Sequence, residues 1–272
     1  MVVQHNLSAM NTNRQMGVVT SALQKSTEKL SSGYKINRAG DDAAGLSISE
    51  KMRSQIRGLN KASDNAQDGI SLIQVAEGAL NETHSILQRM NELATQAAND
   101  TNTSVDRQSI KDEIEQLNEE LDRISTTTQF NKQDLLTGGF SGKLQVGALE
   151  GQTMDVKISL AVSAKGLKVS AVEVSTNAKA GAAMQSIQDA IESVSKQRSK
   201  LGAIQNRLEH TINNLDTNAE NTQAAESRIR DTDMADEMVQ YSKNNILSQA
   251  GQSMLTPVSY THLRAHETSQ DL

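Results

Sequence analysis

The chain has 272 residues, a formal net charge of −6, no cysteine, no tryptophan and only 2% aromatic residues. The negative charge and the scattered Lys and Arg residues argue against a protein that binds nucleic acid. The lack of cysteine excludes disulfides, thiol catalysis and thiolate metal sites. Because aromatic side chains bury the most area per residue, a chain that nearly lacks them is expected to build thin aliphatic cores between long helices.

Residues 1–33 are polar with widely spaced apolar positions, which predicts a weakly amphipathic helix that frays without a partner. They also lack the basic and apolar regions of a cleaved signal, and no run in the chain has the roughly 20 apolar residues of a membrane span. Asp41 or Asp42 is then placed to cap the next helix. A catalytic or metal-binding pair is the alternative, but no His or further carboxylate stands at ligand spacing.

Residues 45–99 contain no proline and are predicted to form one helix reaching about 80 Å, which makes the molecule a rod. Twelve positions in it step by alternating threes and fours, and eleven of the twelve are small or apolar. Such a seam keeps one face toward a partner helix. The seam consists of Leu59, Ala62, Ala66, Gly69, Ile73, Ala76, Leu80, Thr83, Leu87, Met90, Ala94 and Ala97.

Two further helices are predicted from the same periodicity. After a polar turn at residues 99–104, apolar residues recur from Ile110 to Ile124, opposite an acidic face that is expected to be solvated. Residues 178–230 carry an apolar frame from Met184 to Leu215. This frame is the expected antiparallel partner of the seam.

Between these helices the apolar residues alternate with polar ones, near residues 144–146, 154–160 and 167–171, which predicts short strands in hairpins. Residues 234–255 form a second weakly amphipathic helix, so that both chain ends look like half-buried helices that need each other or a neighbouring molecule. Residues 256–272 differ in character, because they hold the only proline and two of the five histidines.

Four motifs resemble bacterial flagellins, and they occur in the order found in that family. They are LSSGYKINRAGDDAAGL at 30–46, QDGISLIQ at 67–74, QNRLEHTINNL at 205–215 and ESRIRDTDMA at 226–235. The resemblance covers roughly residues 1–255. It implies a mainly α fold, which is an elongated antiparallel bundle of three long helices with a small β-hairpin region and terminal helices paired as an inner coiled coil.

The resemblance also implies a division of the chain. Residues 1–44 and 233–255 would form the inner helical domain, the latter truncated. Residues 45–130, the hairpin region 131–177 and the helix 178–232 would form the core domain, without the large outer domains of longer flagellins. Residues 256–272 resemble translated sequencing-adaptor read-through, and we interpret them as a non-native tail.

The resemblance implies a secreted subunit that self-assembles into the extracellular filament of the bacterial flagellum for motility. Its expected partners are other copies of itself, a flagellar export chaperone and the filament cap protein, without nucleic acid or membrane. Subunits of this kind are expected to pass unfolded through a narrow export channel, which suits marginal terminal helices and a chain without disulfides.

The resemblance implies a second role, because flagellins of several bacterial groups are ligands of the host Toll-like receptor 5. The motif for this role appears here as LQRMNEL at 87–93, together with the acidic second helix. The matching positions are Arg89, Leu93 and Glu113. We expect Arg89 and Leu93 to face outward, away from the seam, with Leu93 as an apolar anchor. Alternatively, Arg89 and Glu113 are merely solvated or paired within the chain, and Leu93 packs the filament.

Two other classes of protein remain as alternatives. An enzyme is not expected, since the His-Glu-x-x-His helix of the zinc proteases carried by some flagellins is missing from this sequence, and no catalytic, cofactor or metal site is predicted. His84 and His210 stand singly on helices, and His262 and His266 lie in the tail. A non-flagellar coiled-coil scaffold or signalling protein would also show heptads, but the β segment and the four motifs disfavour it.

Overall fold

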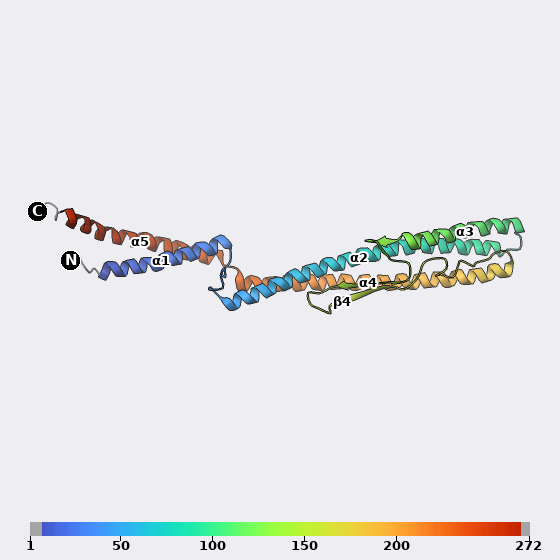
Figure 1. Ribbon diagram of the computed structural model, residues 1–272, viewed down its shortest axis with the longest axis horizontal. Helices are drawn as coiled ribbons and strands as arrows, with labels where there is room; N and C mark the ends of the chain where they lie inside the picture. Colours follow the sequence, from blue (N-terminus) through green and yellow to red (C-terminus); the bar gives the residue numbers. More distant parts are fainter. Residues whose placement is uncertain (1–6, 268–272) are drawn as a thin grey trace. The chain divides into compact units, whose positions relative to one another are not determined.

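The computed structural model describes the backbone of residues 7–267 and side chains up to residue 254 (Figure 1). It is mainly helical, and it divides into a central unit, Gln55–Glu220, and a terminal unit, Met1–Ser54 with Asn221–Leu272. The helices are α1 (Leu7–Ser32), α2 (Ala43–Ala97), α3 (Ser104–Thr127), α4 (Asn177–Arg230) and α5 (Met234–Glu267). The strands are β1 (Gln129–Phe130), β2 (Gln133–Asp134), β3 (Phe140–Gln145) and β4 (Thr153–Ile158).

The core of the central unit lies along α2, which runs antiparallel to α4. All twelve seam residues of α2 are buried, in cores that also hold the apolar frame of α4. Polar contacts fix the direction: Ser63 Oγ donates to Asp216 Oδ1 (3.1 Å), and Thr95 Oγ1 donates to Met184 Sδ (3.3 Å). The predicted pairing of the seam with the frame is therefore confirmed.

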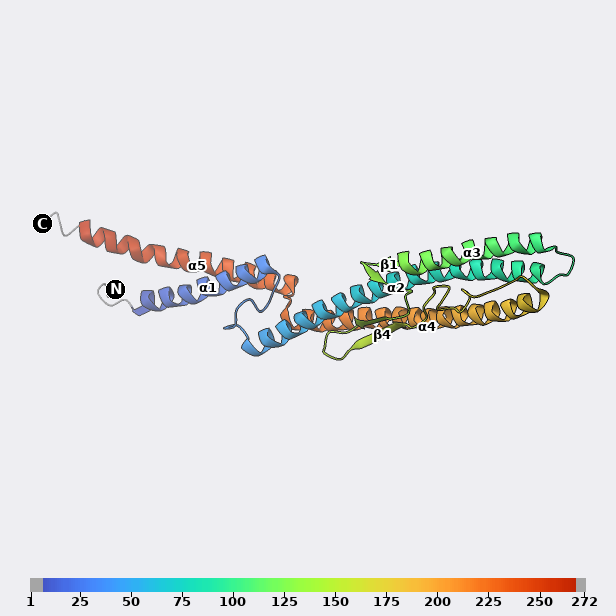
Figure 2. The ribbon, with the colours of Figure 1, turned by 45° about the vertical axis from the view of Figure 1, so that its right-hand side comes forward.

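Helix α3 turns back along α2 and covers a second face of it (Figure 2). A capping box begins α3: the Thr103 hydroxyl accepts from the Asp106 N–H, while the Asp106 carboxylate accepts from the Thr103 N–H. Its apolar positions Ile110, Ile114, Leu121 and Ile124 are buried in the common core. Because α4 covers one face of α2 and α3 covers another, the buried surface of α2 is wider than the single seam.

Two hairpins complete the central unit, β1–β2 and β3–β4, and both are antiparallel. Met154, Val156 and Ile158 alternate with exposed residues along β4 and are buried in the common core. Val146 N–H donates to the Gln152 carbonyl (2.9 Å), so the carbonyls of residues 145 and 157 point out of the hairpin at its two edges.

Amide side chains from the helices meet these edge carbonyls. Asn65 Nδ2 on α2 donates to the Gln145 carbonyl (3.1 Å), and Gln197 Nε2 on α4 donates to the Lys157 carbonyl (3.3 Å). Gly69 on α2 leaves room for the hairpin, since a Cβ there would lie 2.3 Å from Leu144 Cδ1. The β3–β4 hairpin is thus attached to α2 and α4 together.

The expected strand at residues 167–171 is wrong. This segment forms turns closed by local bonds, in which Leu167 N–H donates to the Ser163 carbonyl and Val169 N–H to the Ala164 carbonyl (both 2.9 Å). Lys168 adopts the left-handed conformation with φ of 60°, which a strand does not allow. Leu167 and Val169 are still buried, so the alternation correctly marked burial although it did not indicate a strand.

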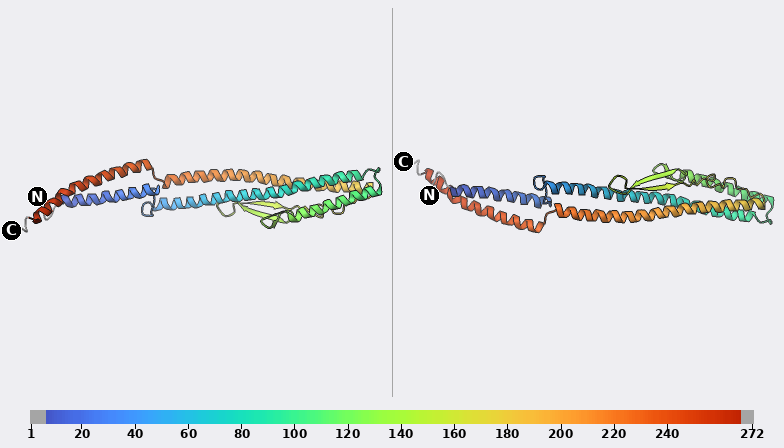
Figure 3. Two further views of the ribbon diagram at one scale, coloured as in Figure 1. Left: turned by 90° about the horizontal axis from the view of Figure 1, so that it is seen from above. Right: turned by 90° about the horizontal axis from the view of Figure 1, so that it is seen from below.

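In the terminal unit, α1 and α5 pack side by side (Figure 3). Lys29 pairs with Glu237 across them (3.4 Å), and the Arg230 guanidinium lies 4.7 Å from the centre of the Tyr34 ring. The predicted pairing of the two end helices is confirmed. Much apolar surface stays exposed on these helices, at Leu7, Met10, Val18, Met234, Met238, Val239, Ile246, Leu247 and Met254.

The two neighbouring aspartates before α2 have separate roles. The Asp42 Oδ1 atom accepts from Gly45 N–H (2.9 Å) and caps the helix. The Asp41 carboxylate accepts from the N–H groups of Asn37 (3.2 Å) and Arg38 (3.0 Å), and these bonds, chiefly the one from Arg38, lower the pKa of Asp41. The sequence left open which one caps the helix, and the structure assigns Asp42.

We expect hydrogen exchange to separate the two units. Only Ser26 is buried in α1, whereas buried apolar residues recur along the parts of α2 and α4 that lie within the central unit. Amides of α1 and α5 should therefore exchange much faster than those between Ala66 and Ala97, because little burial opposes their local opening. Mass spectrometry of the exchanged monomer measures this, and equal protection in α1 and α2 would contradict it.

Acid is expected to weaken the start of α3. The side-chain and backbone hydrogen bonds of Thr103 lower the pKa of Asp106. A lowered pKa in the folded state stabilises the fold above the usual Asp value near 3.9, and this contribution is lost as pH falls through the lowered pKa. The thermal midpoint should drop as the pH falls below about 4, and the drop should be smaller in Asp106→Asn. An identical acid dependence in both proteins would refute this role of Asp106.

Candidate functional site

Arg89 on α2 and Glu113 on α3 form an ion pair across the two helices. The Nε and Nη2 atoms of Arg89 lie 3.0 and 2.9 Å from Glu113 Oε1, and Nη1 lies 3.3 Å from Glu92 Oε2. The hydrogen bond to Glu113, followed by that to Glu92, raises the pKa of Arg89. About half of each side chain in the cross-helix pair is exposed, with 52% for Arg89 and 44% for Glu113. The pair therefore marks a polar surface rather than a core.

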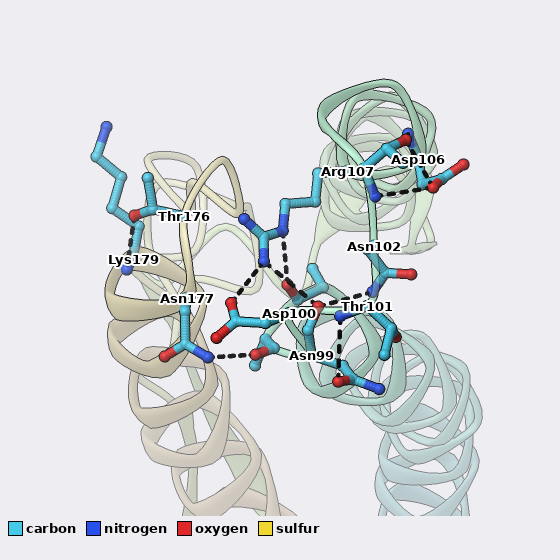
Figure 4. Close-up of polar contacts among 12 residues, drawn as sticks. Asn99, Asp100, Thr101, Asn102, Asp106, Arg107, Thr176, Asn177 and Lys179 are labelled. Atoms are coloured by element: carbon cyan, nitrogen blue, oxygen red, sulfur yellow. Dashed lines mark hydrogen bonds and ion pairs between the residues drawn. The ribbon is translucent and has the colours of Figure 1, made fainter.

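The connection between α2 and α3 fixes how far α3 is shifted along α2, and so which residues of the two helices face each other (Figure 4). Arg107 of α3 reaches back over the end of α2, where its Nε donates to the Ala97 carbonyl (3.1 Å) and its Nη2 to the Asn99 carbonyl (3.3 Å). The Nη2 atom also pairs with Asp100 (3.1 Å), and the Arg107 side chain is only 15% exposed. With Arg107 fixed beside Ala97, the antiparallel course of α3 brings Glu113 level with Arg89.

Helix α4 contributes to the same junction. Asn177, its first residue, donates its side-chain amide to the Ala98 carbonyl, and Thr176 Oγ1 accepts from the Lys179 N–H (3.3 Å) to cap the helix (Figure 4). Residues from α3 and α4 thus bind carbonyls that the end of α2 leaves without helical partners. Residues 99–104 were predicted only as a polar turn, although Thr103-x-x-Asp106 is a recognisable capping signal.

Leu93 does not face outward as predicted. It is 2% exposed and belongs to the main core cluster together with Met90, Ile110 and Ile114. The prediction failed because the heptad seam accounts for one partner helix, whereas α3 covers a second face of α2 one turn from Arg89. The structure therefore brings Arg89 and Glu113 together at the surface and places Leu93 in the core.

The remaining predicted candidates concern metal binding and single histidines. Among the side chains that the structure describes, no group of three His, Asp or Glu residues is placed to hold a metal ion, and no described helix is long and apolar enough to cross a membrane. His84 contacts Gln88 (3.0 Å), and His210 is exposed. The pair His262 and His266 lies outside the described side chains.

Comparison with known families identifies both halves of the chain. The model of the bacterial flagellin N-terminal helical region matches residues 3–141, and that of the bacterial flagellin C-terminal helical region matches residues 184–261. The N-terminal match ends within β3, and the C-terminal match begins within α4. The matched regions contain the Arg89–Glu113 pair, the seam of α2 and most of the helix that packs against it.

Individual relatives agree. The chain is 55% identical over 257 residues to a flagellin of Halalkalibacterium halodurans, covering 94% of both chains. It is 49% identical to a flagellar filament 31.3 kDa core protein of Treponema maltophilum, covering 96% of this chain and 97% of that protein. The crystal structure of Bacillus cereus flagellin matches with a TM-score of 0.51 and 34% identity, covering 60% of this chain and 94% of that one. This chain therefore belongs to the bacterial flagellin family and is a structural subunit of the flagellar filament.

Proposed function

We propose that the chain polymerises through heterologous contacts between copies, and that the exposed apolar faces of α1 and α5 are covered by neighbouring subunits in the filament. The observation that carries this is the amount of apolar surface that pairing of the two helices leaves open, with Leu7 76%, Val18 62% and Ile246 65% exposed. Soluble monomers rarely keep such patches unless they bind a partner. Contacts that do not close on themselves generate an open helical array.

The exposed apolar faces of α1 and α5 also favour binding to a flagellar export chaperone and a cap protein before the subunit is assembled. Exposed apolar helices need cover while subunits are still separate, which a flagellar export chaperone would provide, and a cap protein would direct their addition at the growing end. The chain has no cysteine, so no disulfide hinders passage in an unfolded form. The proposed destination is the extracellular filament.

Seeded polymerisation tests the assembly. Purified full-length chain mixed with fragments of native flagellin filament should extend them, as seen by electron microscopy. Val18→Asp should block extension, because a charge would be buried between copies. Val105→Asp is the matched control, since Val105 on α3 is 72% exposed and lies outside the α1–α5 faces. Failure of the unmodified chain to extend any seed would overturn the proposal.

A second proposed function is recognition of the released monomer by Toll-like receptor 5. It is supported by the half-exposed Arg89, whose planar guanidinium is held in place by Glu113 and Glu92 within the motif that resembles receptor-binding flagellins. A planar cation with a fixed position suits bidentate pairing with a receptor carboxylate or carbonyl. In this proposal Leu93 does not contact the receptor. Its buried side chain keeps the stretch of α2 around Arg89 packed against α3.

Arg89→Ala should weaken binding of the monomer to the soluble receptor ectodomain by about tenfold or more. Its effect on unfolding should stay within about 1 kcal/mol, because the ion pairs are exposed. Arg123→Ala removes a comparable exposed pair with Glu120 on α3 and should leave receptor affinity unchanged. Affinity is measured by surface plasmon resonance, and equal affinity of Arg89→Ala and the unmodified chain would sink the assignment.

Leu93→Ala separates a structural effect from a contact effect. Since Leu93 is buried, the substitution should cost about 2–5 kcal/mol of unfolding free energy. Chemical denaturation of the monomer measures this cost. A loss below about 0.5 kcal/mol would show that Leu93 is not part of the core in solution.

A further inference from the structure

The turn between β3 and β4 presents an exposed leucine on a fixed backbone. Gln145 Nε2 donates to the carbonyls of Gly147 (2.8 Å) and Leu149 (2.7 Å), and Gln152 Oε1 accepts from Leu149 N–H (3.1 Å). The turn is therefore closed by its own side chains. The Leu149 side chain is 69% exposed, so the ordered turn does not serve to bury it within its own chain.

The turn is also attached to α2. Ala148 packs on the small cluster of Leu59, Ala62, Leu215 and Ala219, and a Cβ on Gly58 would lie 2.8 Å from the Ala148 Cβ. An apolar side chain on a preordered turn loses little conformational entropy when it binds, which favours its use as an anchor. Beside it, Glu150 is exposed and makes no ion pair with any described residue. We call Leu149 and Glu150 the knob.

A pocket with a complementary lining lies elsewhere on the central unit. It has a volume of about 310 Å³ and lies between residues 168–173 and α4. Ala171, Val172, Ala182 and Ala183 contribute apolar lining. Glu173, Lys179 and Lys168 also line it. An aliphatic side chain followed by a carboxylate fits this combination of apolar and cationic groups.

Of the two lysines that line the pocket, Lys168 is the one whose ammonium group can pair with a carboxylate from another molecule. Lys179 is already paired with Glu173, whereas Lys168 has no ion pair among the side chains that the structure describes. Lys168 also holds a φ of 60°, a left-handed conformation that is unfavourable for a non-glycine residue.

The knob and the pocket cannot meet within one copy. Ala148, which precedes the knob, lies against Gly58, near the start of the part of α2 that belongs to the central unit. The pocket begins at Lys179, next to Asn177, which binds the Ala98 carbonyl just beyond the end of α2. Residues 58–97 are forty residues of continuous helix, about 60 Å long. Any contact between the two surfaces must join different copies.

We propose that Leu149 of one subunit inserts into the Lys168–Lys179 pocket of a second copy, with the Glu150 carboxylate paired to the Lys168 ammonium. Since knob and pocket are different surfaces roughly 45–60 Å apart along the helices, each subunit offers one of each, and the contact passes from copy to copy. This contact rests on the proposed polymerisation and specifies one of its interfaces.

Engineered cysteines test the contact directly, because the chain has none of its own. Filaments of a Leu149→Cys/Ala182→Cys variant, grown under reducing conditions and then oxidised, should give a ladder of dimers, trimers and longer covalent chains on a denaturing gel. Filaments grown from a mixture of the two single variants should stop at dimers. Leu149→Cys/Lys200→Cys, with the second thiol about 27 Å further along α4, should stay monomeric.

The strained lysine supplies a variant that does not endanger folding. Lys168→Gly relieves the left-handed backbone and removes the ammonium, so it should fold at least as well and yet raise the critical concentration for filament growth about two- to fivefold. Lys132→Gly is the matched control, since Lys132 is exposed with a φ of 64° and should assemble normally. Leu149→Ser should raise the critical concentration about tenfold or more, and Glu150→Lys/Lys168→Glu should assemble better than either single change.

The outcomes separate the two levels of the proposal. Filaments that form without a covalent ladder, or that form equally well from Lys168→Gly, overturn the knob and pocket contact while leaving polymerisation intact. If the unmodified chain forms no filaments under seeding, the proposed polymerisation fails and this contact fails with it.

Discussion

The central unit depends on the packing of α2 against α4 through a seam that is almost entirely small and aliphatic. With two Phe and no Trp in the chain, burial has to be spread over many small contacts instead of concentrated in a few large ones. Long helices achieve this, because each turn adds one more buried residue. The seam also explains why α2 can hold a second layer: small residues keep the helices close, and α3 and the β3–β4 hairpin then rest on the remaining faces.

The distribution of polar contacts follows from this arrangement. Few polar groups are buried in the core, so most contacts that set register lie at helix ends and edges, as with Arg107 over the end of α2 and Asn177 at the start of α4. Arg89 and Glu113 are level with each other because of that junction, not because of their own attraction, which is weak at an exposed site. A polar surface built in this way inherits its geometry from the core.

Much of this structure could be predicted from the sequence where periodicity carried the information. The seam, its partner on α4 and the apolar face of α3 were all correct, because burial repeats regularly along a helix. Leu93 was assigned to the wrong side because a single-partner seam does not reveal a third helix. Residues 167–171 were assigned as a strand because alternating burial can arise from a compact turn as well, and the left-handed Lys168 leaves no local signal in the sequence. The contact of Asn177 with Ala98 joins residues 79 positions apart, which no local pattern indicates. The contacts of Arg107 with the end of α2 depend on the path of the turn between the two helices, which the sequence does not define.

The amides of Asn65 and Gln197 at the two edges of the β3–β4 hairpin have a further consequence. A short two-stranded sheet exposes backbone groups on both sides, and these can recruit strands from other molecules. Engaging a carbonyl on each edge with a helix side chain disfavours such recruitment. A protein that must gather at high local concentration, yet join its neighbours in one order only, is thereby guarded against the competing route of cross-β aggregation.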